Sequence, residues 1–421
     1  MSDLRRLSLG NVYWVRVMHH LRLLSRLGFV TCLGAIALAA GCETFTPAPP
    51  PSAQIRQDET SIVGDTNIIV LVRSEQAANN LIINAARRNY QLNEKTKLDG
   101  LALVLLDFER PPGVGGAVAI GDMEGMEPSA TAGLNHIYTL QRADGTNKTA
   151  PRRQNLARQY AQALIEWPVA GCLAQTKIGM IDGFVDPGRL AQLSENAVVH
   201  DFSTGDPLGT EHGTAIAELL IGQGRLNNAR LYIASVIAET NNREVGTGVP
   251  ELIRAIDWLQ KSGVSLVNIS LAGPYNKLLD RAIQSATAKG MLIIAAVGND
   301  GPNALPRYPA AFDSVIAVTA IDSEREVYAN AIRGGHVDVA APGVDVFVKV
   351  GADGKYLSGT SIAAPFVTAF IAGSKNLAAM ETATEIRNAI ASQSVDLGPP
   401  GPDPVYGVGL VRSDQACETI R

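Results

Sequence analysis

The sequence predicts an α/β fold, in which a doubly wound, mostly parallel sheet carries helices on both faces and follows a small α/β sandwich. Two observations predict this fold. From about residue 177 onward, continuously apolar strands alternate with amphipathic helices, which is typical of a parallel sheet buried on both faces. Before this region, a shorter set of alternating strands and helices lies between two polar segments. Hydrophobic residues make up 46% of the 421, enough for a large core.

The N-terminus predicts an exported protein. Arg22 and Arg26 precede an apolar run over residues 29–40, which is too short to span a membrane and has the length of a signal-peptide core. The run ends in small residues directly before Cys42, a pattern that resembles the lipobox of bacterial lipoproteins. That resemblance implies a signal peptide over 1–42, lipidation of Cys42, and anchoring by lipid to a membrane of the bacterial cell envelope or periplasm. An ordinary signal peptide cut nearby is the alternative.

Between the N-terminus and the large domain the chain divides into three parts. Residues 43–60 are rich in proline and polar residues and predict an extended tether. Residues 61–141 predict a small module, and residues 142–155 are polar and basic and predict an exposed linker that can be cut. In the module we expect strands over 67–72, 101–108 and 136–141, a helix over 75–88 and a glycine-rich loop over 113–125.

The large domain spans residues 156–421. Apolar segments recur along this domain, and we expect strands over 177–181, 230–237, 265–269, 291–297 and 315–321. The expected helices cover 212–222, 249–261, 277–289 and 361 to about 375. The chain has a net charge of −5 and no long basic run after its N-terminus, so nucleic acid is not expected as a partner.

Four short motifs place polar residues where active sites of parallel sheets gather, at the carboxyl ends of strands. Asp182 ends an apolar strand, His212 opens a helix as part of H-G-T, and Asn299 ends the segment A-A-V-G-N. Ser361, in G-T-S-I-A-A-P, stands at the N-terminus of an apolar helix, where a backbone N–H and the helix dipole favour a developing oxyanion. Pro365 falls in the first turn of the expected helix, where its missing N–H costs little.

Together these motifs resemble those of the subtilisin family of serine peptidases, in which the order is also Asp, His, Ser. The resemblance implies a subtilisin-like domain in which Asp182, His212 and Ser361 form a catalytic triad and Asn299 contributes to the oxyanion hole. It implies protein or peptide substrates. The preceding module resembles an inhibitory propeptide, which implies a zymogen whose own propeptide is a partner.

The same resemblance assigns the substrate-binding residues. The segment N-I-S-L-A-G is similar to the family's substrate-lining strand, and A-A-P-G at 340–343 is similar to the turn that precedes the family's serine. The residues that would contact an extended substrate or line its pocket are Ser270, Leu271, Ala272, Gly273, Ala296 and Gly298.

Several positions depart from the family pattern. Gly183 stands where the family usually has a serine or threonine after its aspartate, so Asp182 needs support from elsewhere. Ala215 replaces a second histidine, and Ala272 replaces a glycine. The stretch 222–230, which follows the histidine helix where the family frequently binds calcium, is short and has no carboxylate. We expect no metal site there and no cofactor.

The remaining cysteines and the alternative functions stay open. Cys32 falls in the expected signal core, so Cys172 and Cys417 remain as a pair, which predicts either a disulfide or two buried thiols. The alternative to a peptidase is a catalytically weak or inactive lipoprotein that keeps the fold as a binding module. An esterase of the α/β-hydrolase class is not expected, because no serine stands in a G-x-S-x-G elbow.

Overall fold

A computed structural model describes residues 67–140, 144–145, 160–193, 197–239, 245–349, 354–412 and 417. The predicted signal peptide, Cys42, the tether and most of the predicted linker lie outside these residues. All of the described residues belong to one unit of the chain. Within them, no helix is long and apolar enough to cross a membrane.

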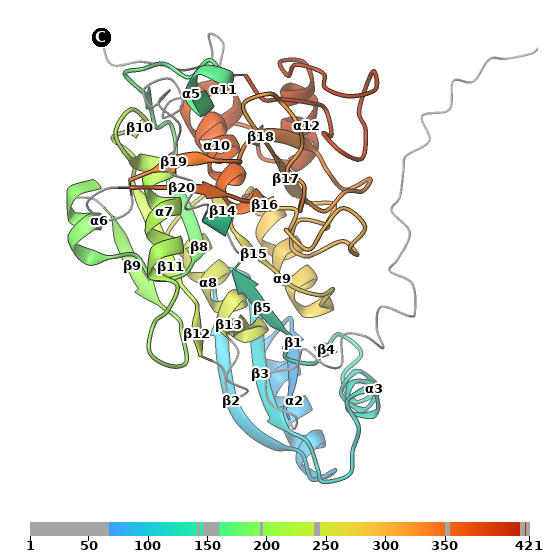
Figure 1. The fold of residues 1–421 in the computed structure, drawn as a ribbon. Coiled ribbons are helices and arrows are strands. Elements are labelled where there is room, and N and C mark those ends of the chain that lie inside the picture. Colours follow the sequence, from blue (N-terminus) through green and yellow to red (C-terminus); the bar gives the residue numbers. More distant parts are fainter. Residues whose placement is uncertain are drawn as a thin grey trace, which may run out of the picture. The chain divides into compact units, whose positions relative to one another are not determined.

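A seven-stranded parallel sheet forms the centre of the large domain (Figure 1). Its strands, in spatial order, are β18 (Val339–Pro342), β17 (Val315–Ile321), β16 (Leu292–Ala296), β14 (Leu266–Ile269), β8 (Ile178–Asp182), β11 (Leu231–Ser235) and β9 (Val198–Asp201). The five predicted strands are all present, with ends within two residues of the prediction. The structure adds β9 and β18 at the two edges, and β18 contains the A-A-P residues that the sequence predicted as a turn.

Helices cover both faces of this sheet, as predicted. They are α7 (Thr210–Ile221) and α10 (Thr360–Gly373) on one face, and α8 (Val249–Lys261) and α9 (Lys277–Thr287) on the other. Strand β16 shows why: Leu292 and Ile294 pack into the core cluster that contains α7 and α10, whereas Ile293 and Ala295 pack into the cluster that contains α8 and α9. Because successive side chains of a strand point to opposite faces, an all-apolar strand requires cover on both sides.

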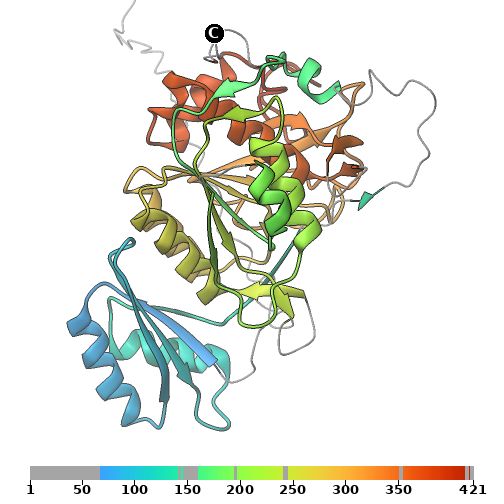
Figure 2. The ribbon, with the colours of Figure 1, turned by 90° about the vertical axis from the view of Figure 1, so that its left-hand side faces the viewer.

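The module before this domain is an antiparallel sheet with two helices, drawn in blue and cyan in Figure 2. Its elements are β1 (Asn67–Val72), α2 (Glu75–Ala86), β2 (Gln91–Leu98), β3 (Leu103–Glu109), α3 (Gly116–Met126) and β4 (Thr131–Gly133), with the sheet order β2-β3-β1-β4. The expected glycine-rich loop over 113–125 was wrong, since most of it is α3. Ala119 and Met123 lie one helical turn apart and are fully buried, so packing outweighs the low helix propensity of the glycines.

The module's sheet is also buried on both faces. In β1, Ile68 and Val70 pack with α2 and α3, whereas Ile69 and Leu71 pack into the core cluster that contains α8 and α9. The module therefore shares a hydrophobic core with the large domain. Polar contacts flank this shared core, including the ion pairs Arg254–Glu94 and Lys277–Glu124 and a hydrogen bond of 3.0 Å from the Leu101 N–H to Asp257 Oδ1.

The chain leaves the module through a strand that inserts into the large domain. Strand β5 (Ile137–Leu140) lies between β13 (Val245–Gly248) and β15 (Leu271–Ala272) and is antiparallel to both, as Figure 1 shows. A second short strand, β6 (Asp144–Gly145), pairs with β20 (Lys355–Ser358), which in turn pairs with β19 (Val346–Val348). The remaining strand of the β5 sheet is β12 (Ala238–Glu239).

The remaining elements of the large domain are short helices and strands. They are α5 (Tyr160–Leu164), β7 (Cys172–Leu173), α6 (Pro187–Leu193), β10 (Leu226–Asn227), α11 (Lys375–Ala378) and α12 (Ala383–Ala391). Of the two states that the cysteine count left open, the structure has the disulfide: Cys172 and Cys417 are bonded, with Cα atoms 5.5 Å apart. The bond joins β7 to a residue that pairs with Ser374, just after α10.

Candidate active site

Asp182 and His212 are in direct contact at the carboxyl end of the central sheet. Asp182 is the last residue of β8 and is fully buried. Its Oδ1 lies 2.7 Å from His212 Nδ1 and accepts a second hydrogen bond of 2.7 Å from the Gly183 N–H. The imidazole is 11% exposed. The carboxylate therefore fixes the orientation of the ring.

His212 and Ser361 come from neighbouring helices. His212 lies in the first turn of α7, which begins at Thr210, two residues earlier than predicted. Ser361 is the second residue of α10, and every residue of that helix is buried. Helices α7 and α10 cover the same face of the sheet and contact each other. The fold thus brings both N-terminal turns to the edge of the sheet where β8 ends.

Pro365 has a different position from the one predicted. Because α10 begins at Thr360, Pro365 lies in the second turn, and it is the residue whose N–H would bond to the Ser361 carbonyl in a regular helix. The carbonyl is instead approached by the Ser270 hydroxyl, at 3.5 Å. Asn268 Nδ2 donates to Ser270 Oγ at 3.0 Å, and Thr368 Oγ1 donates to Asn268 Oδ1 at 3.1 Å. A buried polar chain therefore ties β14 and the predicted substrate-lining segment to helix α10 at Ser361.

Asn299 is held by the residue before Ser361. Its Oδ1 accepts hydrogen bonds from the Thr360 N–H at 3.0 Å and from Thr360 Oγ1 at 2.9 Å. Thr360 Oγ1 accepts in turn from the Gly298 N–H at 3.2 Å. Two donors on the amide oxygen fix which way the side chain is turned, so the Asn299 amide nitrogen points away from Thr360. Thr360 is a supporting residue that was not predicted from the sequence, although its place in the G-T-S motif was a signal for it.

The predicted substrate-lining residues meet the strand that leaves the module. Leu271 pairs with Leu140 and Ala272 with Thr139. A Cβ at Gly273 would lie 2.6 Å from the Tyr138 ring, so the ring packs directly on this glycine. The Tyr138 hydroxyl donates to the Pro274 carbonyl at 2.7 Å.

The two predicted pocket residues, Ala296 and Gly298, lie close to Asn299 in the sequence and not in the substrate-lining segment. Ala296 is the last residue of β16 and is fully buried, and Gly298 bonds to Thr360 and to the Ile332 N–H. The structure therefore groups Asp182, His212, Asn299 and the predicted substrate-lining segment around the N-terminus of α10, and sets β5 along one side of that group.

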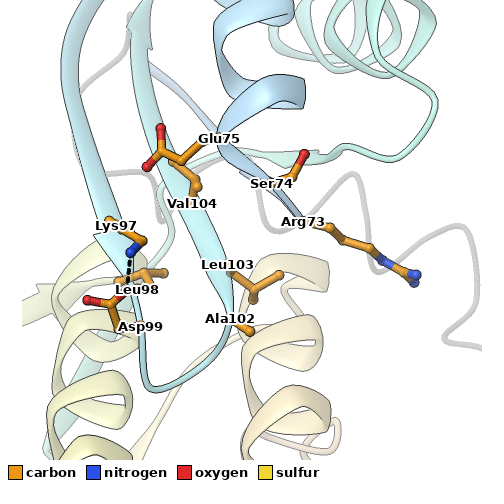
Figure 3. Close-up of a pocket in the computed structure, with 9 residues that line it drawn as sticks. All are labelled: Arg73, Ser74, Glu75, Lys97, Leu98, Asp99, Ala102, Leu103 and Val104. Atoms are coloured by element: carbon orange, nitrogen blue, oxygen red, sulfur yellow. Dashed lines mark ion pairs between the residues drawn. The ribbon is translucent and has the colours of Figure 1, made fainter.

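A cavity of about 240 Å³ lies elsewhere, on the module (Figure 3). Its lining includes the Lys97–Asp99 ion pair, with a separation of 2.6 Å, and none of the candidate active-site residues. It is lined by Arg73, Ser74, Glu75, Lys97, Leu98, Asp99, Ala102, Leu103 and Val104. The described residues contain no group of three or more histidine, cysteine or acidic side chains arranged to hold a metal ion.

Comparison with known proteins agrees with this geometry. The model of the Subtilase family matches residues 180–409. Subtilisin DY from Bacillus licheniformis is 30% identical over 253 residues, covering 56% of this chain and 90% of that protein. Subtilisin Savinase from Lederbergia lenta is 30% identical over 230 residues, covering 51% of this chain and 81% of that protein.

A solved structure extends the likeness of the fold. Fervidolysin from Fervidobacterium pennivorans, described as a keratinolytic enzyme related to subtilisin, superposes with a TM-score of 0.65 and 18% identity over 84% of this chain and 61% of that chain. Its likeness covers more of the chain than the family model does. The predicted subtilisin-like fold is confirmed, and because the family model matches more than half of the residues, the chain belongs to the subtilase family.

Proposed function

We propose that the protein is a serine endopeptidase in which Asp182, His212 and Ser361 form the catalytic triad. The observation that carries this proposal is the 2.7 Å contact between buried Asp182 Oδ1 and His212 Nδ1, with Ser361 at the start of the helix that packs against that of His212. Membership of a family whose relatives are serine proteases supports it.

The residues present supply each step of peptide hydrolysis. His212 Nε2 takes the proton from Ser361 Oγ as that oxygen attacks the peptide carbonyl carbon, and Asp182 stabilises the resulting imidazolium. The oxyanion receives hydrogen bonds from the Asn299 amide and the Ser361 N–H. The imidazolium then gives its proton to the departing amine, and a water molecule, activated by the same imidazole, hydrolyses the acyl-enzyme.

The substrate would bind as an extended strand between β13 and β15. Strand β5 occupies that position in this chain and bonds to both neighbours through its backbone. Recognition by strand addition accepts many sequences, because the backbone supplies most of the hydrogen bonds. In this arrangement Ser270, Leu271, Ala272 and Gly273 contact the substrate, and Ala296 and Gly298 line the pocket for the residue before the scissile bond.

We further propose that residues 61–141 are a propeptide, which the enzyme cuts from itself. The chain is held on both sides of the nucleophile, since Leu140 pairs with Leu271 and Asp144 pairs with Ser358, three residues before Ser361. Leu271, which pairs with Leu140, directly follows Ser270, whose hydroxyl approaches the Ser361 carbonyl. We assign the cut to the segment between about Gln141 and Arg153.

One experiment tests both the activity and the cut. The purified wild-type protein should run as two fragments on a denaturing gel, and mass spectrometry should find a new N-terminus between about Arg142 and Arg153. Ser361→Ala should remain as one uncut and inactive chain with an unchanged melting temperature. Labelling by a serine-reactive fluorophosphonate separates the peptidase from the alternative of a binding module. Wild type that is neither labelled nor cut would support the binding module.

The location in the cell is proposed from the sequence. Lipidation of Cys42 would anchor the protein at the cell envelope, and a cut between about Gln141 and Arg153 would break the covalent link between anchor and enzyme. The shared hydrophobic core and the ion pairs between module and large domain favour continued association after the cut. Cys42→Ser should move both fragments from the membrane fraction to the soluble fraction. Unchanged fractionation and gel mobility would contradict the anchor.

A further inference from the structure

The second oxygen of the Asp182 carboxylate, Oδ2, lacks a hydrogen-bond donor among the described residues. Oδ1 makes both of the hydrogen bonds described above, to Gly183 and His212. Oδ2 is buried and has no hydrogen-bond partner among the residues that the structure describes. A buried carboxylate oxygen without a donor is costly, and nearly all such atoms in folded proteins have one. A donor within reach of Oδ2 therefore stabilises the orientation of the whole carboxylate.

The adjacent residue cannot provide this donor. A hydroxyl side chain directly after the aspartate would be the simplest solution, but residue 183 is glycine. A Cβ at Gly183 would lie 2.6 Å from the Gly209 carbonyl oxygen and 2.9 Å from the Gly209 Cα. Real side chains do not approach backbone that closely, so the loop before α7 excludes a serine at this position. The donor has to come from another strand.

Ser235 stands in the required place. It is the last residue of β11 and pairs in register with Asp182, the last residue of β8. Neighbouring strands lie about 4.8 Å apart and paired side chains project from the same face. Ser235 is 1% exposed, and its Oγ is also buried without a hydrogen-bond partner among the described residues. A hydroxyl that can donate and a carboxylate oxygen that can accept thus project from the same face of two adjacent strands.

We propose that the Ser235 hydroxyl donates a hydrogen bond to Asp182 Oδ2 and that Ser235 is a positioning residue for the triad. Rotation about its Cα–Cβ bond selects among three staggered positions, and the hydroxyl hydrogen turns freely to meet an acceptor. The bond holds the plane of the carboxylate, which keeps Oδ1 directed at His212 Nδ1. No proton is transferred and no bond other than the hydrogen bond forms. The inference rests on the proposed peptidase function.

A matched pair of variants tests it in the full chain. Ser235→Thr keeps the hydroxyl, whereas Ser235→Val has almost the same size and shape without it. We expect kcat near the wild-type value for the threonine variant and about tenfold lower for the valine variant, with KM unchanged in both. Thr319→Val is the control. Thr319 is also fully buried with an unpartnered hydroxyl, but it lies on β17, where it pairs with Ala340. We expect its kcat to stay at the wild-type value.

A second measurement separates positioning from a structural role. Without the donor, the charge on Oδ2 is less compensated and favours the imidazolium, so the acid limb of the kcat/KM profile should move to higher pH in Ser235→Val and not in Ser235→Thr. Equal kcat and equal acid limbs in the two variants would overturn the proposal.

If wild type shows no turnover at all, the proposed function fails, but the role of Ser235 can still be decided. The pH titration of the His212 ring by NMR, in a Ser361→Ala background, should differ between the valine and threonine variants. Identical titrations would overturn the role of Ser235.

Discussion

The side-chain nitrogen of Asn276 lies 2.9 Å from His136 Nδ1, at the boundary between the module and the large domain. The amide cannot turn over, because Asn276 Oδ1 caps helix α9 by accepting from the N–H groups of Leu278 and Leu279. The nitrogen must therefore donate, and His136 must accept with an uncharged ring. Burial lowers the pKa of His136 from 6.5 to about 4 in this state.

This contact predicts that, after the proposed cut, acid weakens the binding of the module to the large domain. Once the module leaves, His136 regains an ordinary pKa near 6.5, so the bound state holds fewer protons. Binding should be strongest above pH 6.5 and should weaken, by on the order of a hundredfold in total, as the pH falls through 6.5 to about 4. Gel filtration of the cleaved complex across this range measures the fraction of module retained.

His136→Gln is the matched control, because its amide oxygen can accept from Asn276 without titrating. Asp257, whose pKa burial raises, also bonds to the module, as does the Lys277–Glu124 pair. These groups are unchanged in the variant, so the difference between the two pH profiles belongs to His136. Equal profiles would rule out a role for His136.

A second prediction concerns the support of Asn299, the proposed oxyanion-hole residue. The Thr360 hydroxyl and N–H both donate to Asn299 Oδ1, and only the hydroxyl is lost in Thr360→Val. We expect kcat to fall about tenfold with little change in KM, because the Asn299 amide is then less firmly directed. Steady-state kinetics on a peptide substrate measure this. Thr360→Ser keeps the hydroxyl and should retain most of the activity, and a serine variant as slow as the valine variant would contradict the role.

Much of this architecture could be predicted from the sequence. Helix α8 and strand β17 have their predicted ends, because each is long, strongly patterned and buried along its length. The motifs led to Asp182, His212 and Asn299, and the first two are in hydrogen-bond contact. These are features that a short stretch of residues determines by itself.

The features that escaped prediction depend on partners distant in sequence. Strand β2 is mostly polar and exposed, and it exists because β3 offers it a backbone edge. Helix α3 forms in spite of its glycines because its apolar residues have a core to fill. Ser235 belongs to no motif, and only the register of β11 against β8 brings it to Asp182. Sequence periodicity carries no information on such register.

A third prediction follows from the close packing of Gly183, next to Asp182 of the proposed triad, against Gly209. Gly183→Ala should be destabilising by about 1–3 kcal/mol, although the family usually has a side chain here, because the new Cβ would clash with the Gly209 carbonyl. Urea unfolding of the Ser361→Ala protein and of the double variant measures the difference without self-cleavage. Gly115→Ala is the control, since a Cβ there would meet nothing within 4 Å. Equal stability of the variants at 183 and 115 would show that the loop at Gly209 yields easily.

The last prediction concerns Tyr138, the side chain that anchors β5 between β13 and β15. It is fully buried, its ring packs on Gly273, and its hydroxyl bonds to the Pro274 carbonyl. Loss of a buried aromatic ring costs about 3–5 kcal/mol, whereas loss of one hydrogen bond costs about 1 kcal/mol. After the proposed self-cleavage, Tyr138→Ala should therefore release active enzyme at protein concentrations about a hundredfold to several thousandfold higher than wild type does, and Tyr138→Phe at concentrations about fivefold higher. Activity on a peptide substrate during serial dilution measures the release. Val118→Ala, on the exposed surface of α3, should behave like wild type. If Tyr138→Ala stayed as fully inhibited as wild type, strand β5 would not be the inhibitory segment, and the shared core with α8 and α9 would have to hold the module by itself.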